Sequence, residues 1–97
     1  MGLRLFMDTH HREQGTFPAE IDTPAFRQFF AAYQEACAAE GVIPVRTHVG
    51  FEEGRAFCYN LAPDADAVRR AHERVGLPFD EITEVLTMSP GDMLLAG

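Results

Sequence analysis

Apolar and polar residues alternate at the beginning of the chain, which predicts a first β-strand that ends near His10. A polar loop containing glycine and proline follows. Aromatic residues then recur at the spacing of an amphipathic helix. We expect Thr23 to cap this helix, Pro24 to lie in its first turn and Gly41 to end it. The apolar side of the strand is formed by Leu3, Leu5 and Met7.

The rest of the chain predicts a hairpin, a second helix and a last strand. The two hairpin strands are expected at residues 42–51 and 56–61. Pro44 marks the first of them as an edge strand, because proline cannot donate a hydrogen bond to a neighbouring strand. A helix is expected at about 64–75 and a strand at 81–87.

This βαββαβ order of elements predicts a single ferredoxin-like α+β domain. The domain spans residues 1–97, with a core at about 3–87 and a short tail at 88–97. We expect an antiparallel sheet of four strands in the order 4-1-3-2, with both helices on one face.

Two helices on one side leave the other face of the predicted sheet uncovered. We expect a second copy of the chain to cover this open face, so that the protein forms a homodimer. The residues that the alternation predicts on the open face are Arg4, Phe6, Asp8, His10, Arg46 and His48.

The charge of the chain argues against several kinds of partner. With 15 acidic and 8 basic residues, the formal net charge is −7, which repels nucleic acids and anionic membranes. The two cysteines form neither a C-x-x-C pair nor a disulfide framework. The apolar stretches are too short for a signal sequence or a transmembrane helix. We therefore expect a soluble, cytoplasmic protein.

Three of the four histidines are expected at one end of the domain. Strands one and two and the second helix run in the same direction in this fold, and His10, His48 and His72 lie toward their C-terminal ends. Imidazole is a common ligand of nickel, zinc and copper, and Asp8 lies on the same strand face as His10. Strand three lies between strands one and two and separates them by about 9–10 Å. His10 and His48 can therefore bind the same ion only if their side chains extend toward each other or if one of them comes from a dimer partner.

Two other functions remain open at this point. One is an enzyme of the dimeric α+β barrel type, with Asp8, His10, His48 and Tyr59 around a pocket for a small organic molecule over the open face. The other is a ligand-sensing or interaction module without chemistry of its own. We single out no catalytic residue, since Cys58 lies in an apolar stretch with no feature that lowers a thiol pKa.

Three segments of the chain resemble a known family. They read FMDTHH, AFCYNLAPDADAVRRAHERVGLP and DEITEV, and the likeness extends from Leu3 to Val85. The sequence is similar to a family of small bacterial ferredoxin-like domains, most of them of unknown function, which includes nickel-binding proteins. The resemblance implies a homodimer that binds nickel or a similar divalent transition metal through histidines.

Position by position, Asp8 and His10 match an M-D-x-H motif of the family, and His72 matches a histidine of its second helix. The resemblance therefore implies that these three residues bind the metal. His48 lies outside the family pattern and is a further candidate ligand. Val75 stands where many relatives have a second histidine, and the loop after the first strand, through Asp22, is longer than theirs.

Overall fold

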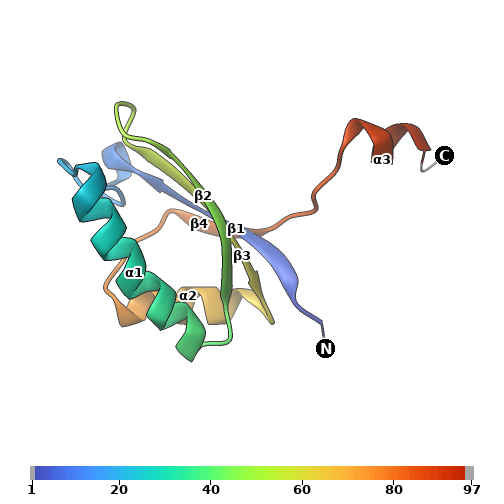
Figure 1. Cartoon of the computed structure of the whole chain (residues 1–97), viewed down its shortest axis with the longest axis horizontal. Helices are drawn as coiled ribbons and strands as arrows, with labels where there is room; N and C mark the ends of the chain where they lie inside the picture. Colours follow the sequence, from blue (N-terminus) through green and yellow to red (C-terminus); the bar gives the residue numbers. More distant parts are fainter. Residues whose placement is uncertain (1, 96–97) are drawn as a thin grey trace.

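The computed structural model describes residues 2–95 and shows a four-stranded antiparallel sheet with α1 and α2 on one face (Figure 1). The strands lie in the order β2-β3-β1-β4, which is the predicted order counted from the other edge, so the predicted fold is confirmed. The elements are β1 (Arg4–His11), η1 (Arg12–Gln14), α1 (Thr23–Ala39), β2 (Ile43–Gly50), β3 (Arg55–Ala62), α2 (Ala65–Arg74), β4 (Glu81–Glu84) and α3 (Pro90–Leu95).

Each of the two large helices begins after an aspartate that caps it. Asp22 accepts a hydrogen bond from the N–H of Ala25 at 2.9 Å, and Asp64 accepts one from the N–H of Ala67 at 2.8 Å. The prediction that Thr23 caps α1 is wrong by one position, because Thr23 is already the first helical residue. Pro24 is tolerated anywhere in the first helical turn, so its position does not show whether Asp22 or Thr23 is the capping residue.

The last strand is shorter than predicted. β4 pairs with β1 up to Glu84 and does not extend to Thr87. The chain then leaves the sheet, and the predicted tail contains α3, which projects away from the sheet and the other helices (Figure 1). None of the helices within residues 2–95 has the length and apolar character needed to cross a membrane.

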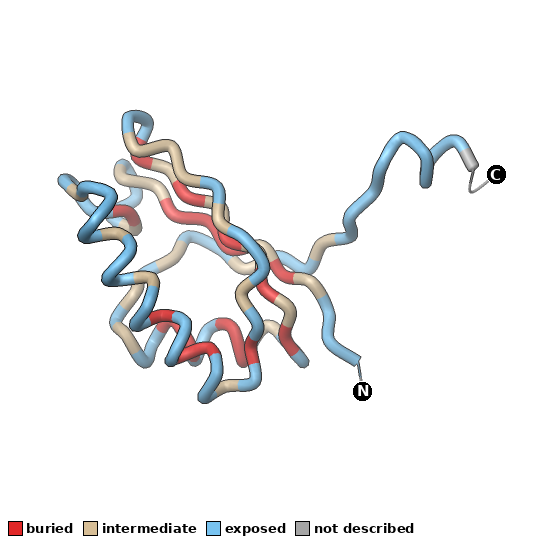
Figure 2. The backbone as a smooth tube through the Cα atoms, viewed as in Figure 1, coloured by how far each residue is buried: buried red, intermediate tan, exposed pale blue. Residues whose placement is uncertain are grey.

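The hydrophobic core lies between the sheet and the inner sides of α1 and α2 (Figure 2). β3 follows the expected alternation, with every second residue buried. The buried core residues are Phe6, Tyr33, Cys37, Val42, Ala62, Ala67, Val68 and Ala71. Burial of this apolar surface is the main force that holds the helices on the sheet.

β1 faces the opposite way from the prediction. Phe6, Asp8 and His10 point toward the helices and are buried, whereas Leu5 and Met7 border a hollow on the open face. The prediction that Arg4, Phe6, Asp8 and His10 lie on the open face is therefore wrong. The polar residues were expected outside, but Asp8 and His10 hydrogen-bond to each other in the interior, which offsets much of the cost of burying them.

Candidate metal centre

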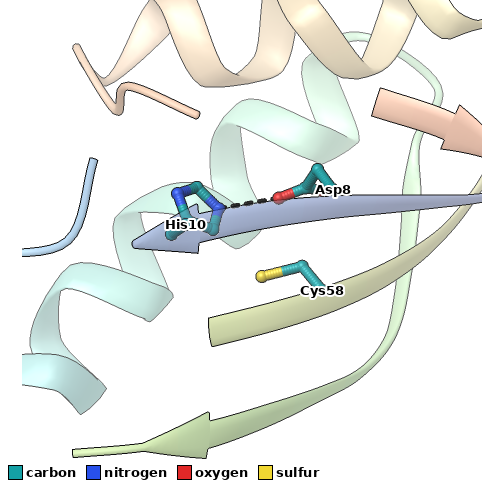
Figure 3. A group of neighbouring side chains, drawn as sticks. All are labelled: Asp8, His10 and Cys58. Atoms are coloured by element: carbon teal, nitrogen blue, oxygen red, sulfur yellow. Dashed lines mark hydrogen bonds and ion pairs between the residues drawn. The ribbon is translucent and has the colours of Figure 1, made fainter. Parts of the chain in front are cut away.

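Three side chains of types that can bind a metal ion lie together beneath the helices (Figure 3). Asp8 on β1 and Cys58 on β3 are direct partners in the sheet, so their side chains leave the same face side by side. His10 follows Asp8 by two residues and therefore shares this face. One donor atom of each residue lies within 4.8 Å of the other two, and all three residues are buried.

Helix α2 adds a fourth side chain to this group. His72 is completely buried, and its Nε2 lies 3.0 Å from Oδ1 of Asp8. Nε2 of His10 lies 2.7 Å from the same oxygen. The two imidazole rings are stacked, with centroids 5.6 Å apart. Residues from β1, β3 and α2 thus meet around one carboxylate.

The backbone determines which nitrogen of each histidine faces this carboxylate. Nδ1 of His10 lies 2.8 Å from the carbonyl oxygen of Pro78, and Nδ1 of His72 lies 2.8 Å from that of Val68. A carbonyl oxygen only accepts hydrogen bonds, so each Nδ1 carries a proton and donates it. The Nε2 atoms are therefore the nitrogens that a metal ion would meet.

Further hydrogen bonds fix the orientation of the acidic and sulfur groups. Oδ2 of Asp8 accepts a hydrogen bond from the amide of Asn60 at 2.9 Å, and the hydroxyl of Tyr33 donates to Oδ1 of Asn60 at 3.4 Å. The hydroxyl of Thr47 donates to Sγ of Cys58 at 3.6 Å. Such outer partners hold metal ligands in place and tune their affinity.

The environment changes the proton affinity of these groups. Burial alone would raise the pKa of Asp8, but hydrogen bonds from His10 and His72 and their charges outweigh it, so the pKa lies below the ordinary 3.8. Burial would lower the pKa of His10, but Asp8 outweighs it and raises the pKa above 6.5. Burial raises the pKa of the Cys58 thiol. Between pH 3.8 and pH 6.5, the metal-free site therefore holds a carboxylate, a protonated His10 and a neutral thiol.

The donor set fits a divalent transition metal. Two imidazole nitrogens, a carboxylate and a sulfur suit nickel, zinc or copper, whereas magnesium and calcium prefer oxygen ligands alone. Both histidines already donate their other N–H to a backbone carbonyl, as metal-bound histidines usually do. A bound ion would have to displace the protons that the Nε2 atoms of His10 and His72 donate to Asp8, and the thiol proton of Cys58.

The residues predicted from the sequence are divided between the two faces of the sheet. Asp8, His10 and His72 come together, but His48 lies on the open face, where its ring packs edge-on against Tyr59 with centroids 5.9 Å apart. His48 therefore does not share a site with the other three within one protomer. The pocket expected to combine Asp8, His10, His48 and Tyr59 is absent from the part of the chain that the structure describes.

Cys58 is the member of this group that the sequence analysis missed. It was set aside because its neighbours are apolar. A signal was present in Asn60, which lies on the same side of β3 as Cys58 and is also buried. A buried asparagine needs polar partners, and this one binds Asp8, the residue opposite Cys58.

Comparison with known proteins relates this arrangement to a family. No curated protein matches the chain. The crystal structure of SCO4226 from Streptomyces coelicolor A3(2) is similar at 30% sequence identity, with a TM-score of 0.74, and the match covers 88% of this chain and 99% of that one. A family model described as nickel responsive protein SCO4226-like matches residues 6–85, which include all four side chains of the site. The chain belongs to the SCO4226-like family of nickel responsive proteins.

Proposed function

We propose that this protein binds a divalent transition metal, with nickel as its natural ion, through Asp8, His10, Cys58 and His72. The observation that carries the proposal is the convergence of two buried Nε2 atoms on one carboxylate oxygen, beside a buried thiol. The description of the family as nickel responsive favours nickel over zinc and copper.

A purely structural role for the same residues is the main competing explanation. Asp8 and the two histidines would then serve only to join α2 to the sheet as a buried charge network. Such a network contributes little net stability compared with apolar packing, and it has no need of a thiol at its edge. It also predicts no metal affinity beyond that of exposed histidines.

Calorimetric titration of metal-stripped protein with nickel tests the proposal. We expect one ion per chain in the wild type and an affinity at least about a hundredfold lower in His72→Ala, because the variant lacks a ligand. His48→Ala is the matched control and should bind as the wild type does, since His48 lies on the other face. Circular dichroism should show that both variants are folded. Equal nickel affinity in His72→Ala and the wild type would contradict the proposed ligand set.

Cobalt provides a spectroscopic test of the sulfur ligand. We expect cobalt-loaded wild type to show a sulfur-to-metal absorption band in the near ultraviolet, and Cys58→Ser to lack it while still binding cobalt. Cys37→Ser is the control, because Cys37 is a core residue on α1 outside the cluster. A band that persists in Cys58→Ser would remove Cys58 from the site.

We further propose that the open face pairs with a second copy of the chain. Leu5 and Met7 lie on this face, and Leu86, which is 86% exposed, lies beside them around the same hollow. Apolar surface of this kind is commonly buried in a dimer. The metal centre is on the helix side, so each protomer would hold its own ion.

Light scattering during gel filtration tests the dimer. We expect a mass of twice 10.8 kDa for the wild type and a single-chain mass for Met7→Lys, because the new charge would be buried in the interface. Leu94→Lys on α3 is the control and should remain dimeric. A single-chain mass for the wild type would rule out the dimer but not the metal site.

A further inference from the structure

An apolar pocket opens between α1 and the sheet. It lies at the end of the molecule that holds the loop from β1 to α1, and this loop can be followed in Figure 1. This loop forms one wall, the first half of α1 forms another, and β1 and β3 contribute to the floor. The pocket has a volume of about 90 Å³. Its aromatic lining consists of Phe17, Phe26, Phe29, Phe30 and Tyr33.

The polar groups in the lining already have partners within the protein. Nε2 of His10 lies 2.7 Å from a carboxylate oxygen of Asp8 and Nδ1 lies 2.8 Å from the carbonyl oxygen of Pro78, so both ring nitrogens already have partners within the protein. The hydroxyl of Thr16 accepts a hydrogen bond from the N–H of His11 and donates to the carboxylate of Asp80, and the hydroxyl of Tyr33 donates to Asn60. Among the described residues that line the pocket, these polar groups are therefore not free to pair with a charged ligand. A charged ligand would lose its hydration without gaining an ion pair, so the pocket favours an uncharged one.

The size and shape of the pocket limit the ligand further. A dry apolar cavity of about 150 Å³ admits benzene, and this pocket, at about 90 Å³, is too small to enclose such a ring unless its opening widens. Phe29 is 40% exposed, so a small outward turn of its ring would widen the opening. Aromatic side chains contact another ring favourably through edge-to-face or offset stacking. A single aromatic ring matches these properties.

We propose that this pocket binds a small, uncharged organic molecule built on a single aromatic ring. The ligand would enter past the exposed ring of Phe29 and contact His10 and Cys58 on the floor of the pocket. His10 and Cys58 also belong to the proposed metal centre, so the test uses metal-stripped protein. Failure of the nickel experiments would leave this proposal unaffected, and the reverse also holds.

Titration of isotope-labelled, metal-stripped protein with toluene, followed by NMR, tests the proposal. We expect saturable shifts for the residues around the pocket, such as Phe17 and Phe30, and none for α3. Benzoate and benzylamine have similar shapes but carry charges, and they should bind about tenfold or more weakly. The proposal is overturned if toluene shows no saturation up to its solubility, or if benzoate binds equally well.

Variants that fill the pocket locate the site. Ala56→Leu extends a side chain from the floor, and Ile21→Trp fills the pocket from the loop, where the structure tolerates change more easily. In each folded variant, toluene affinity should fall about tenfold or more. Leu86→Ala, on the open face, should leave the affinity unchanged. Unchanged toluene binding in a folded pocket variant would show that toluene binds elsewhere and would overturn the assignment.

Discussion

Replacement of Asp8 by asparagine is expected to lower the free energy of unfolding of the metal-free protein by about 3–5 kcal/mol, the usual cost of removing one partner from a buried charge pair. The variant keeps the size of the side chain and the capacity for hydrogen bonds. It removes the negative charge that balances His10 and faces His72 in the interior. Urea unfolding at about pH 6, where His10 is charged, measures the effect. The same variant should lose nickel binding.

Asp66→Asn provides the matched control for this experiment. Asp66 forms an ion pair with Arg69 at 2.6 Å, but both residues are exposed on α2. Solvent screens such pairs, so the control should change the midpoint of unfolding very little. If Asp8→Asn unfolds at nearly the same urea concentration as Asp66→Asn, the buried carboxylate does not carry the charge assigned to it.

Nickel affinity is expected to depend steeply on pH. The ion must displace at least the second proton of His10 and the thiol proton of Cys58, and the pKa values of both groups are raised. Below pH 6.5, affinity should therefore increase about a hundredfold or more per pH unit, or about tenfold per unit for each proton released. Calorimetry in buffers of different ionisation enthalpy counts these protons. Affinity that is constant across this range would exclude a site that contains both ligands.

The stability of the metal-free protein should also depend on pH, through Asp8 and His10. The pKa of Asp8 lies below 3.8, so its contribution is present above that pH and is lost as pH falls through the lowered pKa. The pKa of His10 lies above 6.5, so its contribution is fully present below that pH and is lost as pH rises through the raised pKa. The metal-free protein should thus be most stable between these limits. Nickel should preserve stability at higher pH, which thermal unfolding with and without the ion can measure.

Local patterns in the sequence predict the elements of this fold well. Pro24 in the first turn of α1 and the positive-φ glycine Gly41 after its end mark the limits of that helix. Pro44 correctly indicated an edge strand. From these elements, the order βαββαβ was sufficient to predict which strands are neighbours, because few topologies are compatible with it.

The direction in which β1 faces could not be predicted in the same way. A period of two shows that Asp8 and His10 share a side, but it does not show which side is buried. The usual rule places charged residues outside. Here their partners are Asn60 on β3 and His72 on α2, which are 52 and 64 residues away from Asp8 in the chain, so no local pattern reveals them.

The candidate site could be predicted only in part, because its residues are far apart in the sequence. The resemblance to the family pointed to Asp8, His10 and His72, and the structure brings these side chains together. Cys58 became a candidate only when the pairing of β1 with β3 placed it opposite Asp8. His48 was included because its strand ends at the same end of the domain, but the opposite orientation of its side chain separates it from the others.

The spacing of these residues has a consequence for the order of events during synthesis. A growing chain whose β1 and α1 have left the ribosome already exposes Asp8 and His10, but His72 follows 64 residues after Asp8. Translation adds roughly 5–20 residues per second, so several seconds pass before the proposed ligands exist in one chain. The centre would therefore form only on a nearly finished polypeptide. Newly made protein would then bind nickel only after α2 has packed against β1 and β3.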